Sequence, residues 1–302
     1  MKKEKPSKTA YKVALNILAL GAKPEMAGIL PSGIVNATEK LLISSGVASA
    51  KTVRLYRSRR MVRVYEFFDW MMPGQFEGFA CRKAFCERQV RQSIDAGARQ
   101  VLVLGAGYDT MGWRLAPEFP NVNFFEIDHP ATACLKALGI KEMGLRPNLY
   151  LIAEDLSERK LSDVLSDNVD WRLSAQTVIV AEGLLQYLSP VEVRDLFAQC
   201  AAITGECRIV FTYISTGEDG RPDCGPRTRL VLWLLKVGGE PWLWSVRPEE
   251  LGQFLKSVGW INAPELEGAA GKHGVEMYAV ATKSSRTDTE QGTEGDAANH
   301  SP

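Results

Sequence analysis

One short segment of the chain joins a buried strand to a glycine-rich turn, and it constrains the fold more than any other feature. The segment reads V-L-V-L-G-A-G-Y-D-T from Val101 to Thr110. Four consecutive apolar residues are typical of a strand that is covered on both faces in a parallel sheet. Glycines directly after such a strand let the backbone turn tightly and approach a ligand closely. The segment therefore predicts an open α/β sheet with a ligand at the carboxyl end of this strand.

Two further buried runs end in carboxylates that belong at the same edge of the predicted sheet. Residues 122–127 lead to Asp128, and residues 149–153 lead to Asp155. In open α/β sheets, an acidic residue at the tip of the second strand accepts hydrogen bonds from the hydroxyl groups of a ribose. The glycine turn and the two carboxylates together predict a pocket for a nucleoside.

The residues around the turn favour a cationic nucleoside over a dinucleotide. The dinucleotide fingerprint has Gly or Ala three positions after the second glycine, where this chain has Thr110. The carboxylate of Asp109 would also repel a pyrophosphate at the start of the next helix. S-Adenosylmethionine carries a sulfonium and no phosphate, so we expect it as the ligand, with a nicotinamide dinucleotide as the alternative. We expect Asp109 and Thr110 mainly to cap the helix that starts near Met111.

Strands and helices alternate along the chain after residue 98. The predicted helices lie at 190–202 and 248–258, and the predicted strands at 101–104, 122–127, 149–153, 178–181, 209–213 and 277–281. This alternation predicts an α/β fold with a doubly wound, mostly parallel sheet. The run at 275–282 comes last, and we expect it to form a hairpin at the edge of the sheet.

The rest of the chain divides into three further parts. Residues 1–75 are predicted to form a helical cap, with helices at 10–20, 35–44 and 53–71. The α/β sheet domain is predicted at 76–283, and it begins with a helix at 79–96 that ends at Gly97. The insertion at 217–247 begins with glycines and prolines and ends with tryptophans, so it is either a lid over the ligand or part of the core. The tail at 284–302 has no large apolar residues and is predicted to be disordered.

The composition excludes several classes of function. The 302 residues include 36 basic and 36 acidic side chains, which argues against broad nucleic-acid binding. Six cysteines without a C-x-x-C pair and only three histidines argue against a zinc site and favour a reducing, cytoplasmic location. The apolar run at 13–20 is interrupted by Asn16 and has helical spacing, which favours a helix over a signal peptide. The run at 230–235 is too short to span a bilayer, so we expect no membrane partner.

Five arginines at positions 54, 57, 59, 60 and 63 gather on one predicted helix. Such a run usually forms the solvated face of an amphipathic helix, and binding of a phosphate or carboxylate is the alternative. His129 follows Asp128, and we expect it to be a residue of the strand end and not a base.

Several motifs in order resemble those of the leucine carboxyl methyltransferase family, which includes bacterial O-methyltransferases of small molecules. They are G-A-G-Y-D-T at 105–110, F-E-I-D-H-P at 125–130, E-D-L at 154–156, A-E-G-L-L-Q-Y-L at 181–188 and E-P-W…P-E-E-L…F-L…G-W at 240–260. The resemblance covers roughly residues 76–283. It implies the class I methyltransferase fold, with a seven-stranded sheet and a helical insertion before the last helix and strand hairpin.

The resemblance also implies a set of cofactor-binding residues: Arg82, Gly105, Ala106, Gly107, Asp128, Asp155, Leu156 and Glu182. In this assignment Gly105 lines the methionine end, Asp128 holds the ribose, and Asp155 with Leu156 frames the adenine. Glu182 would lie below the transferring methyl group. Arg82 would bind the methionine carboxylate, with Lys83 as the neighbouring alternative. The family's further lysine contact has three candidates, which are Lys8, Lys12 and Lys23.

The sequence thus predicts an S-adenosylmethionine-dependent methyltransferase that methylates a carboxylate or hydroxyl of a small molecule or peptide terminus. An ionised carboxylate acceptor needs no base, and no pair of a base and an orienting residue is visible in the sequence. Two alternatives stay open, a nicotinamide-dependent oxidoreductase and a non-catalytic protein that binds adenosylmethionine.

Overall fold

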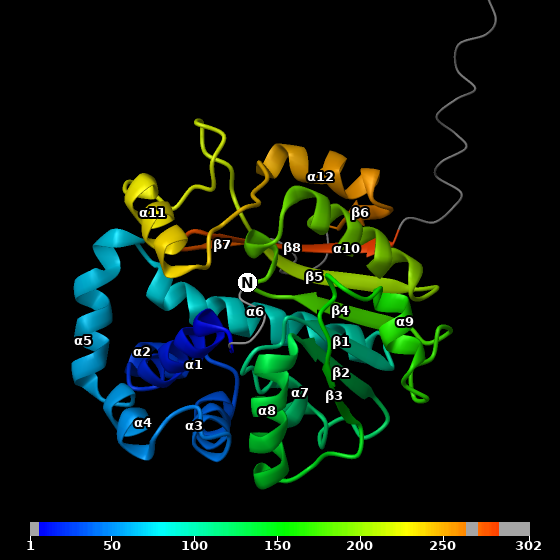
Figure 1. The fold of residues 1–302 in the computed structure, drawn as a ribbon, viewed down its shortest axis with the longest axis horizontal. Coiled ribbons are helices and arrows are strands. Elements are labelled where there is room, and N and C mark those ends of the chain that lie inside the picture. Colours follow the sequence, from blue (N-terminus) through cyan, green and yellow to red (C-terminus); the bar gives the residue numbers. More distant parts are fainter. Residues whose placement is uncertain (1–5, 264–270, 284–302) are drawn as a thin grey trace, which may run out of the picture.

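The computed structural model describes residues 6–263 and 271–283, in which eight strands form one sheet (Figure 1). The strand order is β3-β2-β1-β4-β5-β8-β6, and β7 pairs with β8 beside this path. The strands are β1 (Gln100–Leu104), β2 (Asn123–Asp128), β3 (Leu149–Ala153), β4 (Thr177–Ala181), β5 (Cys207–Ile214), β6 (Trp260–Asn262), β7 (Gly271–His273) and β8 (Glu276–Lys283). The first five strands are parallel, whereas β8 is antiparallel to each of its neighbours. The predicted mostly parallel sheet is confirmed, with β7 as a short addition to its seven main strands.

The position of the last strand corrects one prediction. We expected residues 275–282 at the edge of the sheet, but β8 lies between β5 and β6 and bonds to both. The sequence gives little sign of β6, because its three residues are too few to show a period of two. Trp260 nevertheless anchors β6, since its side chain is fully buried and its indole N–H donates to the carbonyl of Phe197 at 2.9 Å.

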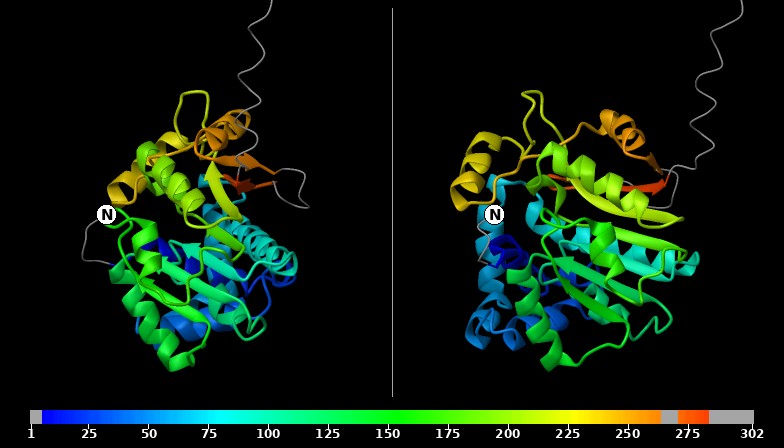
Figure 2. Two further views of the ribbon diagram at one scale, coloured as in Figure 1. Left: turned by 90° about the vertical axis from the view of Figure 1, so that its right-hand side faces the viewer. Right: turned by 45° about the vertical axis from the view of Figure 1, so that its right-hand side comes forward.

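Helices cover both faces of the sheet (Figure 2), as the doubly wound prediction requires. The helices of this part are α6 (Gln75–Asp95), α7 (Met111–Leu115), α8 (Pro130–Met143), α9 (Leu161–Ser166), α10 (Pro190–Ala202) and α12 (Pro248–Ser257). Leu102 and Leu104 of β1 face the side of α9, α10 and α12. Val101 and Val103 face the side of α6 and α7. The continuous apolar run in β1 therefore serves two cores at once.

The N-terminal helices form a layer beside α8. They are α1 (Lys8–Leu20), α2 (Pro24–Ala27), α3 (Ile34–Ser44), α4 (Ala50–Tyr56) and α5 (Arg59–Phe68), followed by the 3-10 turn η1 (Asp69–Met71). The single helix predicted at 53–71 is wrong, because Ser58 adopts an extended backbone with a ψ of 148° and separates α4 from α5. Val53 and Val62 pack into different clusters, so each half of this segment follows its own core.

The insertion at 217–247 is divided between core and surface. Trp244 and Val246 belong to the core on the side of α10 and α12. In contrast, helix α11 (Thr228–Gly238) buries only Val231 among its described side chains. No helix in the described ranges is long and apolar enough to cross a membrane. The predicted disorder of residues 284–302 lies outside the described residues.

Candidate functional site

The glycine turn after β1 has the backbone that the sequence predicted. Gly105 and Gly107 have φ values of 65° and 49°, which lie in the left-handed region. A Cβ on Gly105 would lie 2.9 Å from Leu184 Cδ1, and one on Gly107 would lie 3.0 Å from the Cβ of Ala10 in α1. The turn is thus held between the loop after β4 and helix α1, and both positions require glycine.

Asp128 stands directly beside this turn. Its Oδ2 accepts a hydrogen bond of 2.6 Å from the backbone N–H of Gly107. Burial raises the pKa of Asp128, although the Gly107 N–H and the ammonium of Lys136 act in the opposite direction. A half-buried carboxylate with a raised pKa gains from any further hydrogen-bond donor, such as the hydroxyl groups of a ribose.

Asp155 and His129 complete the same edge. The register places Asp128 opposite Ala153, so the chain beyond β3 continues next to the tip of β2. Asp155 Oδ1 accepts from the Ser157 N–H at 2.9 Å, and its Oδ2 lies 3.8 Å from His129 Nε2. His129 Nδ1 accepts from the Ala131 N–H and so caps α8, as expected for a residue of the strand end. Leu156 packs partly buried against the core.

A buried ion cluster lies between α6, the turn after β1 and the end of β4. Arg82 Nε donates to Glu182 at 2.8 Å, and Arg82 Nη1 donates to Glu276 at 2.5 Å. Lys83 Nζ lies 2.9 Å from Glu182 and also bonds to Asp109. The side chains of Arg82 and Glu276 are each only 5% exposed, so water screens these charges little.

The cluster holds two cations and three carboxylates. Burial lowers the pKa of Arg82, but Glu276 and Glu182 raise it, and the raising effect is the larger. Burial raises the pKa of Asp109, but Lys83 holds it below its usual range. With all five groups ionised, the cluster carries an excess of one negative charge, which suits a ligand with a net positive charge.

The predicted site residues thus fall into two groups at one edge of the sheet. Arg82 and Glu182 belong to the ion cluster, whereas the glycine turn, Asp128, Asp155 and Leu156 surround the tips of β1, β2 and β3. Asp109 links the two groups, because its Oδ1 accepts from the Met111 N–H at 2.6 Å while its Oδ2 accepts from Lys83. The predicted capping by Asp109 is therefore confirmed. Thr110 makes no side-chain capping bond, and its hydroxyl accepts from Arg114 instead.

Two members of this site were not predicted from the sequence. Glu276 lies 194 residues from Arg82 in the chain, on a strand that we expected at the edge. Gly183 has a φ of 61°, and a Cβ there would lie 3.0 Å from Arg82 Nη1. A glycine after Glu182 was a visible clue that some group approaches the backbone closely at this point.

The first turn of α1 joins the insertion to α8. Glu240 accepts from the N–H and the hydroxyl of Thr9, and the Ser7 N–H donates to Thr132 Oγ1 at 3.0 Å. The cap and the insertion therefore meet above the carboxyl ends of the strands. Lys8 and Lys12 of α1 are exposed, whereas Lys23 bonds to Glu66 and Glu77 within the cap and in α6.

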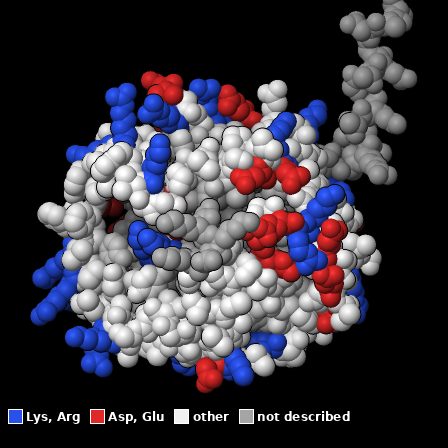
Figure 3. Space-filling model, viewed as in Figure 1, with Lys and Arg blue, Asp and Glu red and all other residues white. Residues whose placement is uncertain are grey.

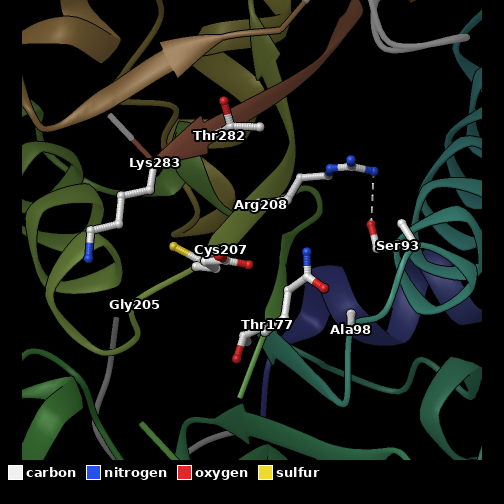
Figure 4. Close-up of a pocket in the computed structure, with 11 residues that line it drawn as sticks. Ser93, Ala98, Thr177, Gly205, Cys207, Arg208, Thr282 and Lys283 are labelled. Carbon is white, nitrogen blue, oxygen red and sulfur yellow. Dashed lines mark hydrogen bonds between the residues drawn. The ribbon is translucent and has the colours of Figure 1, made fainter. Parts of the chain in front are cut away.

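A separate cavity of about 280 Å³ lies at the opposite end of the sheet (Figure 4). Thr177 and Cys207, which begin β4 and β5, line it together with Lys283 at the end of β8. Figure 4 shows Arg208 pointing toward Ser93, to which it donates at 3.2 Å, and Lys283 pointing the other way. Ligands of open α/β sheets bind at the carboxyl ends of the strands, so this cavity is not the candidate site.

Comparison with known proteins gives a family for the chain. The family model described as leucine carboxyl methyltransferase matches residues 43–201, which is slightly more than half of the chain. The match begins in α3, earlier than the resemblance from residue 76, and ends before the motif at 240–260.

Curated relatives and a solved structure agree with this match. A “Putative S-adenosyl-L-methionine-dependent methyltransferase” of Mycolicibacterium paratuberculosis is 31% identical over 126 residues, which are 42% of this chain and 39% of the relative. A Bacillus subtilis protein of the same description, YktD, is 27% identical over 182 residues, which are 59% of each chain. The matches thus span less than two thirds of either relative.

The solved structure of a “putative methyltransferase” from Thermobifida fusca YX superposes with a TM-score of 0.57. The superposition covers 87% of this chain and 98% of that one at 16% sequence identity. At this identity the likeness establishes the fold and does not extend to activity.

Proposed function

This chain belongs to the leucine carboxyl methyltransferase family, and from that premise we propose that it transfers a methyl group from S-adenosylmethionine to an oxygen of its acceptor. The observation that carries the proposal is the meeting of the glycine turn, Asp128 and Asp155 at one edge of the sheet. The acceptor class we propose is a carboxylate or hydroxyl of a small molecule or peptide terminus.

The charges at this edge support the assignment of the cofactor. Adenosylmethionine carries a sulfonium, an ammonium and a carboxylate, and its net positive charge complements the excess negative charge of the ion cluster. We assign the ribose to Asp128, the adenine to Asp155 and Leu156, and the methionine end to Gly105. Arg82 uses Nε and Nη1 for its two glutamates, and we assign its Nη2 to the methionine carboxylate.

The protein's part in the reaction is to position the acceptor and to exclude water. Adenosylmethionine, held in this assignment by Arg82, Gly105, Asp128 and Asp155, would supply an electrophilic methyl group with its sulfonium sulfur as the leaving group. Aligned reactants reach effective molarities on the order of 10⁵ M or more. Glu182 Oε1 contacts both Arg82 and Lys83 as part of the ion cluster, and we propose an acceptor that is already ionised and needs no base.

Binding of ligand to the purified protein tests the cofactor assignment. We expect adenosylhomocysteine and adenosylmethionine to raise the thermal midpoint, because ligand at about 100 times its dissociation constant stabilises by about 2.7 kcal/mol. NAD and NADP should leave the midpoint unchanged, since Thr110 replaces the third glycine of the dinucleotide fingerprint and the carboxylate of Asp109 repels a pyrophosphate. A midpoint raised by NAD alone would support the oxidoreductase alternative. Binding of adenosylmethionine without methylation of any carboxylate or hydroxyl in a screen would support the alternative of a non-catalytic binding protein.

Two tryptophans of the insertion test where the acceptor binds. We propose that residues 217–247 and the N-terminal helices form the acceptor pocket, because Glu240 and Thr9 already join them. Trp242 lies partly exposed beside this contact. Trp244 is 5% exposed and packs in the core, with its ring centre 5.4 Å from that of Phe254. Trp242→Ala should therefore raise the KM for an acceptor found in the screen while the affinity for adenosylhomocysteine stays unchanged.

Trp244→Ala serves as the matched comparison for this experiment. It should destabilise the fold by about 3–5 kcal/mol, as expected when a large aromatic side chain is removed from a core. Denaturant unfolding measures both variants. If Trp242→Ala loses as much stability as Trp244→Ala, the whole segment is core and the acceptor pocket must lie elsewhere.

A further inference from the structure

Helix α11 exposes the side that an ordinary surface helix would bury. Leu230, Trp233, Leu234 and Val237 recur with helical spacing on one face, and all four are exposed. Trp233 is 58% exposed. Apolar residues scattered singly over a surface are ordinary, but a continuous apolar stripe on one helix usually marks an interaction surface.

The end of α5 and the turn η1 expose a second group of apolar side chains. Val64, Phe67, Phe68 and Trp70 are exposed, and Phe67 reaches 71%. The rings of Phe67 and Phe68 meet edge to face at a centroid distance of 5.2 Å. These aromatic side chains are exposed to solvent and do not join the buried core of the cap helices next to them.

The two groups belong to one side of the molecule. Arg227, which precedes α11, donates to the carbonyl of Trp70 at 2.8 Å, and its guanidinium lies 4.5 Å from the centre of the Trp70 ring. We call the combined surface the aromatic face, and its residues are Val64, Phe67, Phe68, Trp70, Leu230, Trp233, Leu234 and Val237.

Basic residues outnumber acidic ones in the two segments that carry the aromatic face. The segments 54–71 and 227–237 contain eight basic side chains and two acidic ones, although the whole chain is neutral. Of the two acidic residues, Glu66 pairs with Lys23, and Asp69 accepts from the Gly74 N–H. Among the basic residues, Arg57 pairs with Glu39. In Figure 3, basic side chains lie above and below an uncharged strip at the left edge, in the region of α5 and α11. The chemistry that complements this surface is apolar and negatively charged.

We propose that the aromatic face docks the protein on the surface of an anionic lipid bilayer. Tryptophan and phenylalanine flanked by arginine suit the boundary between headgroups and acyl chains, and basic residues are attracted to anionic lipids. A second copy of the chain fits less well, because a symmetric contact would bring two basic rims together. The expectation of no membrane partner concerned spanning segments, which surface docking does not require. This docking does not depend on the methyl-transfer proposal.

Flotation of the full chain with lipid vesicles tests the proposal. We expect the protein to float with vesicles of phosphatidylserine and phosphatidylcholine, to float much less with phosphatidylcholine alone, and to be released by salt. The double variant Phe67→Ser with Trp233→Ser should lower the vesicle partition coefficient by about tenfold or more. Arg60→Glu with Arg229→Glu should lower it to a similar degree, about tenfold, on the anionic vesicles.

A matched double variant provides the control. Leu138→Ser with Val191→Ser removes side chains that are 57% and 75% exposed on α8 and α10, away from the aromatic face, and should leave flotation unchanged. Thermal unfolding should show that all of these variants remain folded. Failure of the parent to float, or equal loss in both apolar double variants, would overturn the proposal. Light scattering provides a further test of the occupant. A dimer that only the Phe67→Ser with Trp233→Ser variant abolishes would also overturn the proposal, because the aromatic face would then bind a second copy of the chain.

Discussion

Replacing Arg82 with methionine is expected to lower the free energy of unfolding by about 3–5 kcal/mol. The substitution removes the shared donor of Glu182 and Glu276. Glu276, with a side chain only 5% exposed, then keeps Gln75 as its side-chain donor among the described residues. Lys83 would still hold Glu182. Removing the cation of a buried ion pair is strongly destabilising, because a buried carboxylate is left without a counter-charge. Replacing both members of such a pair by apolar residues changes the free energy of unfolding much less. Denaturant unfolding monitored by circular dichroism measures the effect.

Arg91 provides a matched comparison on the same helix. It also pairs with two glutamates, Glu87 and Glu118, but its side chain is 35% exposed. Arg91→Met should therefore cost no more than about 1 kcal/mol. Adding Glu276→Gln to Arg82→Met should recover part of the loss, because it removes the unpaired buried charge. If Arg82→Met costs no more than Arg91→Met, the cluster is not the buried, mutually dependent set that its geometry indicates.

The parts of the site that follow buried strands could be predicted from the sequence. The run at 101–104 identifies β1 because a parallel strand is apolar on both faces, and the residues after it occupy the carboxyl edge by topology alone. The same argument places Asp128 and Asp155, since their strands pair in parallel with fixed register. Local sequence patterns were sufficient to place a residue at this edge wherever its position depends only on the direction of a parallel strand.

Contacts between distant segments could not be predicted in this way. Glu276 joins Arg82 because β8 inserts between β5 and β6, and that insertion depends on pairing partners that no local period encodes. The break at Ser58 has a similar origin, because Val53 and Val62 are drawn into separate cores. The α11 sequence has the pattern of a buried helix, and only the structure shows that its apolar side is exposed.

Replacing Asp128 with alanine is expected to weaken adenosylhomocysteine binding by roughly 30- to 1000-fold, or about 2–4 kcal/mol. In the proposed site this carboxylate accepts hydrogen bonds from the ribose, and alanine offers no acceptor. Titration calorimetry measures the affinity, and a thermal melt shows whether the variant is folded. A folded Asp128→Ala variant that binds as tightly as the parent would rule out the ribose assignment.

Asp128→Asn separates ribose binding from support of the turn. Asp128 also accepts from the Gly107 N–H at 2.6 Å, so alanine removes a bond that holds the glycine turn as well. Asparagine keeps an acceptor for that N–H but loses the charge, so it should restore the thermal midpoint while regaining only part of the affinity. Because burial raises the pKa of Asp128, protonation on acidification should weaken adenosylhomocysteine binding at a higher pH than an ordinary aspartate would. The Asn variant cannot lose a charge at this position, so its affinity should lack that part of the pH dependence. If parent and Asn variant weaken in parallel on acidification, the titrating group belongs to the ligand or to another residue, and Asp128 does not bind as a carboxylate.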